Sequence, residues 1–368
     1  MNFLPVFEKF ERPVRIAGPC SAESEEQVLT AAHALAAQNI DLFRAGIWKP
    51  RTRPGGFEGA GVEGLRWLRK VKEETGLKVT TEVANTQHVF EALKYRIDVL
   101  WLGARTTVNP FSVQEVADAL TGVDIPVLVK NPINADLKLW LGAIERIHNA
   151  GIRRIGVVHR GFSYHGDTKF RNVPRWELTI ELKRQLPGLQ IICDHSHICG
   201  NRHMLAAIAQ RALDLNYDGL MTEVHPCPDE ALSDAQQQIT PFAYGEMMAG
   251  LVTRQPTSDD AEFLQSLDHL RHQIDDLDEE LFQILSARMK VAEQIGEYKL
   301  RNNISILQPA RWNEILEAAF EKGKPLGLSE TMISTILRAV HQESIEHQAR
   351  VMNENVAAAG GVKAGHKM

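Results

Sequence analysis

The feature that most constrains the fold is a unit that recurs eight times between about residue 14 and residue 252. Each unit is a short apolar segment followed by a polar turn, and helical patterns with apolar residues at three- and four-residue spacing lie between the segments. The predicted strands cover residues 14–18, 42–47, 78–83, 99–103, 126–130, 154–158, 189–193 and 218–223. The predicted helices include residues 25–37, 62–74, 137–150, 175–185 and 202–215. Eight such units in about 240 residues predict an α/β fold of the TIM (β/α)8 barrel type.

An open, doubly wound sheet is the alternative architecture. Such a sheet usually has fewer units and a glycine-rich phosphate-binding turn after its first strand, and the sequence offers neither. We therefore assign residues 1–252 to the barrel.

A second, all-α domain follows the barrel. The polar residues 253–261 form a predicted linker, and three helical patterns then fill residues 262–356, separated by Asn302, Asn303 and Pro309 and by a Pro-Leu-Gly break at 325–327. We expect residues 357–368 to be a disordered tail. A three-helix unit of this size buries too small a core to be stable alone, which predicts a homodimer or a higher homo-oligomer.

Composition excludes several classes of protein. A formal net charge of −6 argues against nucleic-acid binding, and neither a signal peptide nor an apolar run of membrane-spanning length occurs, so we expect a cytoplasmic protein. The four cysteines show no CxxC pair, which argues against a disulfide framework and a zinc knuckle. An anionic ligand would therefore have to be bound by local clusters of arginine and lysine.

Polar side chains follow most of the predicted strands, at the barrel end that carries active sites. Cys20, His197, Glu223 and Asp234 are far apart in sequence, but each follows a strand that a closed barrel would bring together. Each taken alone is more simply explained as a buried thiol, a loop histidine or a solvated acid. Together, a thiolate, an imidazole and two carboxylates suit a divalent transition-metal ion with an open position for substrate.

Cations form a second set at the same end of the barrel. They lie at the ends of strands or in the turns that follow: Lys49, Arg51, Arg53, Arg105, Lys130 and Arg160. Cations in a cleft without matching acids usually bind an anion, and guanidinium groups suit phosphate or carboxylate. So many cations suggest two phosphorylated substrates, although solvated charges at the rim are the simpler explanation for Arg53.

These motifs carry a resemblance to a known family. GPCS at residue 18, KPRT at 49, GAR at 103, VKNP at 129, HRG at 159, SH at 196, EVHP at 223 and LSD at 232 resemble 3-deoxy-D-arabino-heptulosonate 7-phosphate (DAHP) synthases of type Iβ. The resemblance implies condensation of phosphoenolpyruvate with erythrose 4-phosphate, dependent on a divalent metal ion such as Mn²⁺. The related synthase of an eight-carbon sugar acid, 3-deoxy-8-phosphooctulonate synthase, is the alternative, and KPRT favours the four-carbon acceptor. His195 stands where relatives commonly carry proline.

The resemblance also assigns roles to individual residues. It implies that the metal ligands are Cys20, His197, Glu223 and Asp234. It implies that the phosphoenolpyruvate site is formed by Lys49, Arg105, Lys130 and Arg160, of which the two lysines are catalytic. It implies that Arg51 and Thr52 bind the sugar phosphate.

The helical domain resembles the all-helical chorismate mutases. The residues that carry this resemblance are Arg271, Arg288, Lys299, Arg311, Ser344 and Gln348, and Gln308 replaces an aspartate that some relatives have. The resemblance implies that Lys299 and Gln348 donate to the ether oxygen of chorismate, while the arginines and Ser344 bind the substrate. Arg271 and Arg288 are 17 residues apart, about 25 Å along a helix. The family's swapped dimer would place Arg271 in the partner's site.

Two alternatives for this domain stay open. Its periodicity suits a dimerisation module without activity equally well. If it is a mutase, we expect it also to regulate the barrel by feedback, because the barrel begins close to residue 1 without a regulatory domain of its own.

Overall fold

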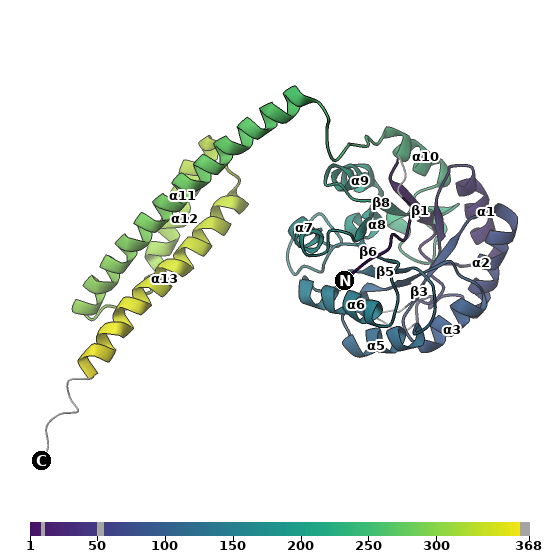
Figure 1. Ribbon diagram of the computed structural model, residues 1–368, viewed down its shortest axis with the longest axis horizontal. Helices are drawn as coiled ribbons and strands as arrows, with labels where there is room; N and C mark the ends of the chain where they lie inside the picture. The colour runs from purple at the N-terminus through teal and green to yellow at the C-terminus, as the bar shows by residue number, and fades with distance from the viewer. Residues whose placement is uncertain (9–11, 50–54, 361–368) are drawn as a thin grey trace, which may run out of the picture. The chain divides into compact units, whose positions relative to one another are not determined.

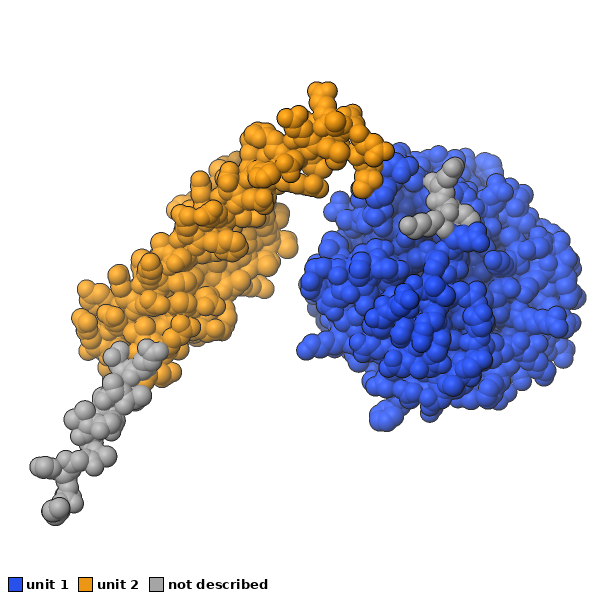
Figure 2. Space-filling model, viewed as in Figure 1, with its two compact units in different colours: residues 1–256 blue, residues 257–368 orange. Residues whose placement is uncertain are grey.

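The computed structural model describes residues 1–8, 12–49 and 55–360, with side chains except those of residues 309–310 and 354–360. It has two compact units, residues 1–256 and residues 257–368 (Figure 2). We predicted residues 253–261 as a linker; residues 253–260 have no regular secondary structure, and Ala261 already begins a helix.

The first unit is a closed barrel of parallel strands in which each strand pairs with the next and β8 pairs with β1 (Figure 1). The strands are β1 (Val14–Gly18), β2 (Leu42–Arg44), β3 (Val79–Val83), β4 (Val99–Leu102), β5 (Val127–Lys130), β6 (Ile155–His159), β7 (Gln190–Asp194) and β8 (Gly219–Glu223). The predicted TIM barrel is confirmed. Strand β2 ends earlier than predicted because Gly46 leaves the ladder and forms a bridge with Ser21.

Helices surround the barrel (Figure 1). They are α1 (Glu25–Ala36), α2 (Val62–Thr75), α3 (Thr86–Lys94), α4 (Ala104–Thr107), α5 (Pro110–Ala119), α6 (Leu137–Asn149), α7 (Trp176–Gln185), α8 (His195–Cys199), η1 (Arg202–Met204), α9 (Leu205–Asp214), η2 (Pro228–Glu230), η3 (Ala235–Gln237) and α10 (Pro241–Gly250). Side chains cap several N-termini: Ser24 accepts from Gln27 N at α1, and Asp136 accepts from Leu139 N at α6.

The barrel has two apolar cores. One lies between strands and helices, and the other fills the interior with side chains that include Ile16, Trp101 and Met221. Phe7 joins the interior core, and the backbone N–H groups of Val6 and Phe7 donate to Gln190 Oε1 over 2.8 and 3.0 Å. The start of the chain therefore closes the barrel end opposite to the carboxyl ends of the strands.

The second unit consists of α11 (Ala261–Arg301), α12 (Pro309–Gly323), η4 (Lys324–Leu326) and α13 (Glu330–Gly360). Helices α11 and α13 pack closely at Gly296, where a Cβ atom would lie 3.0 Å from Gln348 Cα. Helix α13 continues to Gly360, beyond residue 356 where we expected the domain to end, because the strong helix formers Ala357, Ala358 and Ala359 extend it. Residues 361–368 of the predicted tail lie outside the described residues. Within the described part of the chain, no helix is long and apolar enough to cross a membrane.

Candidate active sites

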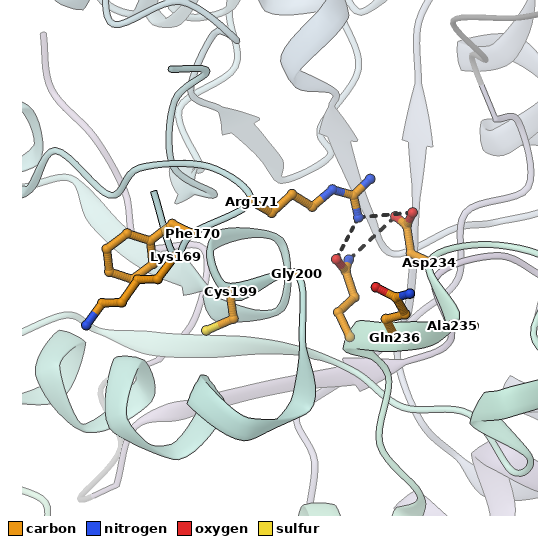
Figure 3. Close-up of a pocket in the computed structure, with 9 residues that line it drawn as sticks. Lys169, Phe170, Arg171, Cys199, Gly200, Asp234, Ala235 and Gln236 are labelled. Atoms are coloured by element: carbon orange, nitrogen blue, oxygen red, sulfur yellow. Dashed lines mark hydrogen bonds and ion pairs between the residues drawn. The ribbon is translucent and has the colours of Figure 1, made fainter. Parts of the chain in front are cut away.

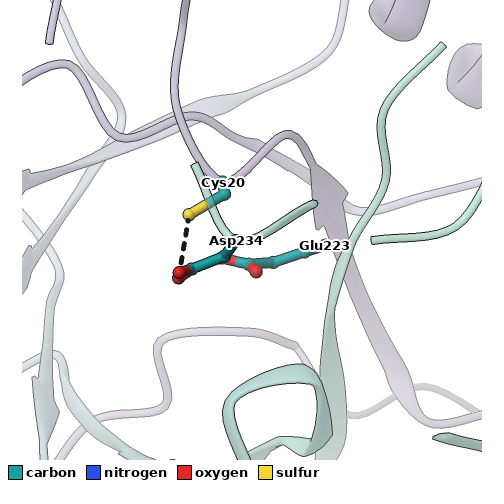
Figure 4. A group of neighbouring side chains, drawn as sticks. All are labelled: Cys20, Glu223 and Asp234. Carbon is teal, nitrogen blue, oxygen red and sulfur yellow. Dashed lines mark hydrogen bonds between the residues drawn. The ribbon is translucent and has the colours of Figure 1, made fainter. Parts of the chain in front are cut away.

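A thiol and two carboxylates meet at the carboxyl end of the barrel. The ligand atoms of Cys20, Glu223 and Asp234 lie within 4.8 Å of one another (Figure 4). Cys20 follows β1 and Glu223 ends β8, and the two strands pair with Gly18 opposite Glu223. The Cys20 Sγ atom lies 3.4 Å from Asp234 Oδ2. Closure of the barrel between its first and last strands thus creates the cluster.

His197 lies beside this cluster on α8. Its Nδ1 atom lies 2.9 Å from Asp194 Oδ2, and its Nε2 atom lies 3.8 Å from Asp234 Oδ2. A carboxylate on one imidazole nitrogen orients the ring and leaves the other nitrogen available as a ligand. The Nδ1 atom also lies 3.7 Å from Glu223 Oε1, so all four predicted metal ligands lie in one neighbourhood.

The electrostatics of the cluster suit a cation. Burial would raise the pKa of Glu223, but His197 and Arg44 lower it below its usual value, so the carboxylate is ionised. Its Oε1 atom forms an ion pair with Arg44 at 3.2 Å and accepts no hydrogen bond from the described residues. Burial, followed by the charge of Glu223, raises the pKa of the Cys20 thiol. A divalent ion beside these groups would favour the thiolate and could bind the Glu223 oxygen that accepts no hydrogen bond.

A cavity of about 250 Å³ opens next to the cluster. Five cations line it, together with His197 and Asp234: Lys49, Arg105, Lys130, Arg160 and Arg171. Burial, with further contributions from Arg171 and Arg105, lowers the pKa of Arg160 to about 10. Because the guanidinium groups disfavour one another's charge, the cavity is suited to an anion.

Two of these lysines are held by groups of the barrel. Lys49 Nζ lies 3.0 Å from Cys20 Sγ and donates to the Cys20 carbonyl over 3.2 Å. Burial would lower the pKa of Lys49, but Cys20 and Glu223 raise it above its usual value. Lys130 Nζ forms an ion pair with Asp194 Oδ2 at 2.9 Å. The predicted residues Arg51 and Thr52, and also Arg53, lie outside the described residues.

Comparison with known proteins identifies the barrel. Residues 9–253 match the profile of the DAHP synthetase I family. This chain belongs to the DAHP synthetase I family. Phospho-2-dehydro-3-deoxyheptonate aldolase of Thermotoga maritima is 32% identical over 227 residues, which cover 61% of this chain and 64% of that protein. The chain therefore spans less than two thirds of that relative's length.

A further relative and two solved structures are also similar to this chain. The 2-dehydro-3-deoxyphosphooctonate aldolase of Syntrophotalea carbinolica is 28% identical over 244 residues, covering 61% of this chain and 84% of that protein. The crystal structure of the Thermotoga maritima DAHP synthase superposes with a TM-score of 0.58 at 29% identity, covering 64% of this chain and 67% of that one. A truncated form of that enzyme superposes with a TM-score of 0.56 at 27% identity, and the match covers 64% of this chain and 84% of that one.

Several residues of this DAHP synthetase I family site were not predicted from the sequence. Arg44 in β2 is buried and contacts Glu223, and Asp194 at the end of β7 binds both Lys130 and His197. Arg171 forms an ion pair with Asp234 at 3.0 Å and borders a second cavity, of about 530 Å³ (Figure 3). Gln237 donates to Glu223 over 2.6 Å. Arg44 could have been recognised in the sequence, because it is a single charged residue within an apolar predicted strand.

Three further histidines near the predicted strand ends do not take part in the Cys20, Glu223 and Asp234 cluster. His159 packs among aromatic rings, and Tyr217 Oη lies 2.9 Å from its Nδ1 atom. His225 Nε2 lies 3.6 Å from Glu23 Oε2. His195 is buried with its Nε2 atom 3.1 Å from Thr222 Oγ1, and burial lowers its pKa to about 4.

The helical unit brings part of its predicted site together between α11 and α13. Arg288 donates to Ser344 Oγ, and Gln348 Nε2 donates to the Ser344 carbonyl over 3.2 Å. Gln348 Oε1 is buried without a hydrogen bond from the described residues. Lys299 donates to the Ile306 carbonyl, and burial lowers its pKa. Arg288, Ser344 and Gln348 therefore lie together where α11 packs against α13.

The other two predicted residues lie apart from this group. Arg311 is exposed and pairs with Glu314 at 2.8 Å, and Arg271 is exposed on the first half of α11. His341 was not predicted from the sequence: it stacks on Trp312 with ring centroids 4.2 Å apart. Residues 270–349 match the chorismate mutase type II profile, which covers this group of residues.

Proposed function

We propose that this chain is a bifunctional enzyme. Its barrel condenses phosphoenolpyruvate with erythrose 4-phosphate to DAHP and phosphate, and its helical unit rearranges chorismate to prephenate. The observation that carries the first activity is the Cys20, Glu223 and Asp234 cluster facing a cavity lined by five cations. Two phosphorylated substrates and one metal ion account for both halves of that site.

The residues of the barrel divide the condensation between them. Arg105, Lys130 and Arg160 bind phosphoenolpyruvate, and Asp194 fixes the position of the Lys130 ammonium. A divalent ion such as Mn²⁺ on Cys20, His197, Glu223 and Asp234 would supply polarisation of the acceptor aldehyde. The enol carbon forms a bond with the aldehyde carbon, water adds at the neighbouring carbon, and phosphate leaves.

Lys49 is the proposed electrostatic stabiliser of the aldehyde oxygen in this reaction. Its raised pKa keeps the ammonium protonated, and Cys20 holds it next to the metal ligands. It can therefore place a positive charge and an N–H donor beside the aldehyde oxygen as negative charge develops there. Arg51 and Thr52 are proposed to bind the phosphate of erythrose 4-phosphate.

Phosphoenolpyruvate consumption tests the first activity. We expect the full chain to consume it with erythrose 4-phosphate, to stop after treatment with a chelator and to recover with Mn²⁺. Turnover with arabinose 5-phosphate but not erythrose 4-phosphate would instead support the octulosonate synthase, the activity named for several relatives at 28–29% identity. Full activity after complete removal of metal would contradict the metal-dependent mechanism.

The second activity needs charge complementarity rather than a nucleophile. The rearrangement is unimolecular. The enzyme therefore accelerates it by holding the two carboxylates of chorismate and by stabilising charge on its ether oxygen. We assign these roles to Arg288 and Ser344, and to Lys299 and Gln348, with Arg311 as a further binding group. Loss of chorismate absorbance with the full chain tests this. If the wild-type protein showed none, the unit would be a dimerisation module.

We further propose a homodimer, formed through α11. Its first half exposes apolar side chains at helical spacing: Leu270, Ile274, Leu277 and Leu281. A second copy would cover them and place Arg271 in the partner's mutase site. Sedimentation of Leu277→Glu tests this, with exposed Glu280→Gln as the control, and a dimeric Leu277→Glu protein would contradict it.

Feedback control and location complete the proposal. Prephenate bound to the helical unit lowers the synthase rate, and an unchanged rate with added prephenate would refute this. All four cysteines are free thiols, which fits a reducing compartment such as the cytoplasm.

A further inference from the structure

One buried amide connects both carboxylates of the Cys20, Glu223 and Asp234 cluster. Gln237 Nε2 donates to Glu223 Oε2 over 2.6 Å and lies 3.5 Å from Asp234 Oδ2. The side chain belongs to the residue that ends η3 and is 1% exposed. A single NH₂ group therefore fixes the rotation of two carboxylates that lie 11 residues apart in sequence.

Arg171 determines which way this amide points. Its Nη1 atom donates to Gln237 Oε1 over 2.6 Å and forms an ion pair with Asp234 Oδ1 at 3.0 Å, the latter marked by a dashed line in Figure 3. A guanidinium can only donate and an ionised carboxylate can only accept. The oxygen of Gln237 must therefore face Arg171 and its nitrogen must face the acids.

Both acids are ionised, so the donated hydrogen bonds are charge-assisted. Burial would raise the pKa of Asp234, but His197 and Arg171 lower it well below its usual value. Glu223 is likewise ionised, and Gln237 occupies its Oε2 atom while Oε1 accepts no hydrogen bond from the described residues. The amide thus orients Glu223 so that Oε1, which faces Arg44 at 3.2 Å, is the oxygen not taken by a hydrogen bond.

The neighbouring glutamines serve as internal comparisons. Gln238 accepts from the Cys20 N–H over 3.0 Å and donates to the Ser233 carbonyl over 2.8 Å, so it supports the backbone of the cluster. Gln236 has an exposed side chain in the same short helix as Gln237. Of three consecutive glutamines, Gln237 alone donates to the acidic side chains among the hydrogen bonds described for this part of the chain.

We propose that Gln237, held by Arg171, is a positioning residue that sets the affinity of this cluster for a divalent cation. The inference rests on the proposed metal-dependent function. Without the amide, two close carboxylates repel each other and turn away, and they must be reordered when the cation binds. Loss of such an outer partner typically weakens metal binding by about 10–100-fold.

Titration of the full-length chain with Mn²⁺ alone, followed by electron paramagnetic resonance of the free ion, tests this. We expect Gln237→Met, which keeps the length of the side chain but removes its hydrogen bonds, to raise the dissociation constant by at least about tenfold. The matched control Gln236→Met should bind as the wild-type chain does. Wild-type affinity in Gln237→Met would overturn the inference.

Further readouts separate positioning from folding and from the metal-dependent function itself. The metal-free Gln237→Met chain should unfold at a temperature close to that of the wild type, and its synthase turnover should recover at saturating Mn²⁺. If Gln237→Met does not fold, Arg171→Met is the variant to test, because the Arg171 side chain is 43% exposed and its replacement disturbs the fold less. We expect Arg171→Met to bind Mn²⁺ several-fold more weakly than the wild type. An unchanged affinity would overturn the inference. A wild-type chain that binds no Mn²⁺ while Glu223→Ala behaves identically would refute the metal-dependent function instead.

Discussion

Replacing Lys130 by methionine isolates the contribution of a buried ion pair. The Lys130 ammonium lies 2.9 Å from Asp194 Oδ2, and the two residues are 4% and 0% exposed. Methionine fills a similar volume but leaves the carboxylate without this partner. Removal of one partner from a buried pair costs about 3–5 kcal/mol. Because His197 Nδ1 stays 2.9 Å from the same carboxylate oxygen, we expect a loss near 3 kcal/mol in the free energy of unfolding of the barrel.

Urea unfolding followed by tryptophan fluorescence measures this loss, because five of the six tryptophans lie in the barrel unit. With a slope of at most about 3 kcal/mol per molar urea, the midpoint should fall by about 1 M or more. Lys138→Met, on the exposed face of α6, is the control and should stay within about 0.5 kcal/mol of the wild type.

A double variant and a change of pH test the electrostatic explanation itself. The double variant Lys130→Met with Asp194→Asn leaves no unpaired charge. Its loss in the free energy of unfolding should therefore be smaller than the summed losses of the two single variants by more than about 1 kcal/mol. Burial opposes ionisation of Asp194, yet His197 and Lys130 hold its pKa well below the usual value. The pair therefore stabilises the fold above about pH 4 and loses this contribution as the pH falls further. A loss for Lys130→Met below about 1 kcal/mol, or one as large at pH 3 as at pH 7, would refute the reasoning.

Other predictions follow from single contacts. Glu223→Ala should abolish metal-dependent phosphoenolpyruvate consumption and spare chorismate turnover, and an active variant would contradict the ligand assignment. Gln348→Ala should lower the mutase rate by about 10²–10³, read from chorismate absorbance, with the synthase rate unchanged. Gly18→Ala should cost more than about 3 kcal/mol in urea unfolding, because φ is +147° and a Cβ atom would lie 2.1 Å from the Arg44 carbonyl oxygen. Gly142→Ala, with no atom within 4 Å of the added carbon, should instead gain about 0.5–1 kcal/mol.

The barrel could be predicted because its strands are buried on both faces. Such strands are continuous apolar runs, and eight of them at regular spacing leave few other topologies. The positions of Cys20 and Glu223 followed from the same argument, since neighbouring strands place their carboxyl ends together. Helices α3 and α5, of 9 and 10 residues, were not among the predicted helices, although α7 and α9 of similar length were.

Side-chain direction and hydrogen-bonding partners could not be predicted from spacing. His159 follows Val158, which faces the barrel interior, so strand alternation turns the histidine toward the helices and away from the cavity. Gln237 belongs to a run of three glutamines, and only the folded loop determines which of them faces Glu223. The surroundings of Arg44 in β2 likewise depend on the fold, because the side chain contacts Glu223 of β8 and Trp101 of β4.

The pairing of β1 with β8 has a consequence for the order in which the chain can assemble its site. Cys20 and Glu223 are 203 residues apart (223 − 20), yet their strands are hydrogen-bonded neighbours. A ribosome-bound chain that lacks residues 219–234 has the cysteine but neither acid, so the cluster forms only once the last strand and the loop to Asp234 have been made and the ring has closed. Any ion that binds these groups then holds the first strand against the last one, and it stabilises the closed ring according to its concentration. Metal supply would thereby influence how much newly synthesised protein completes its barrel.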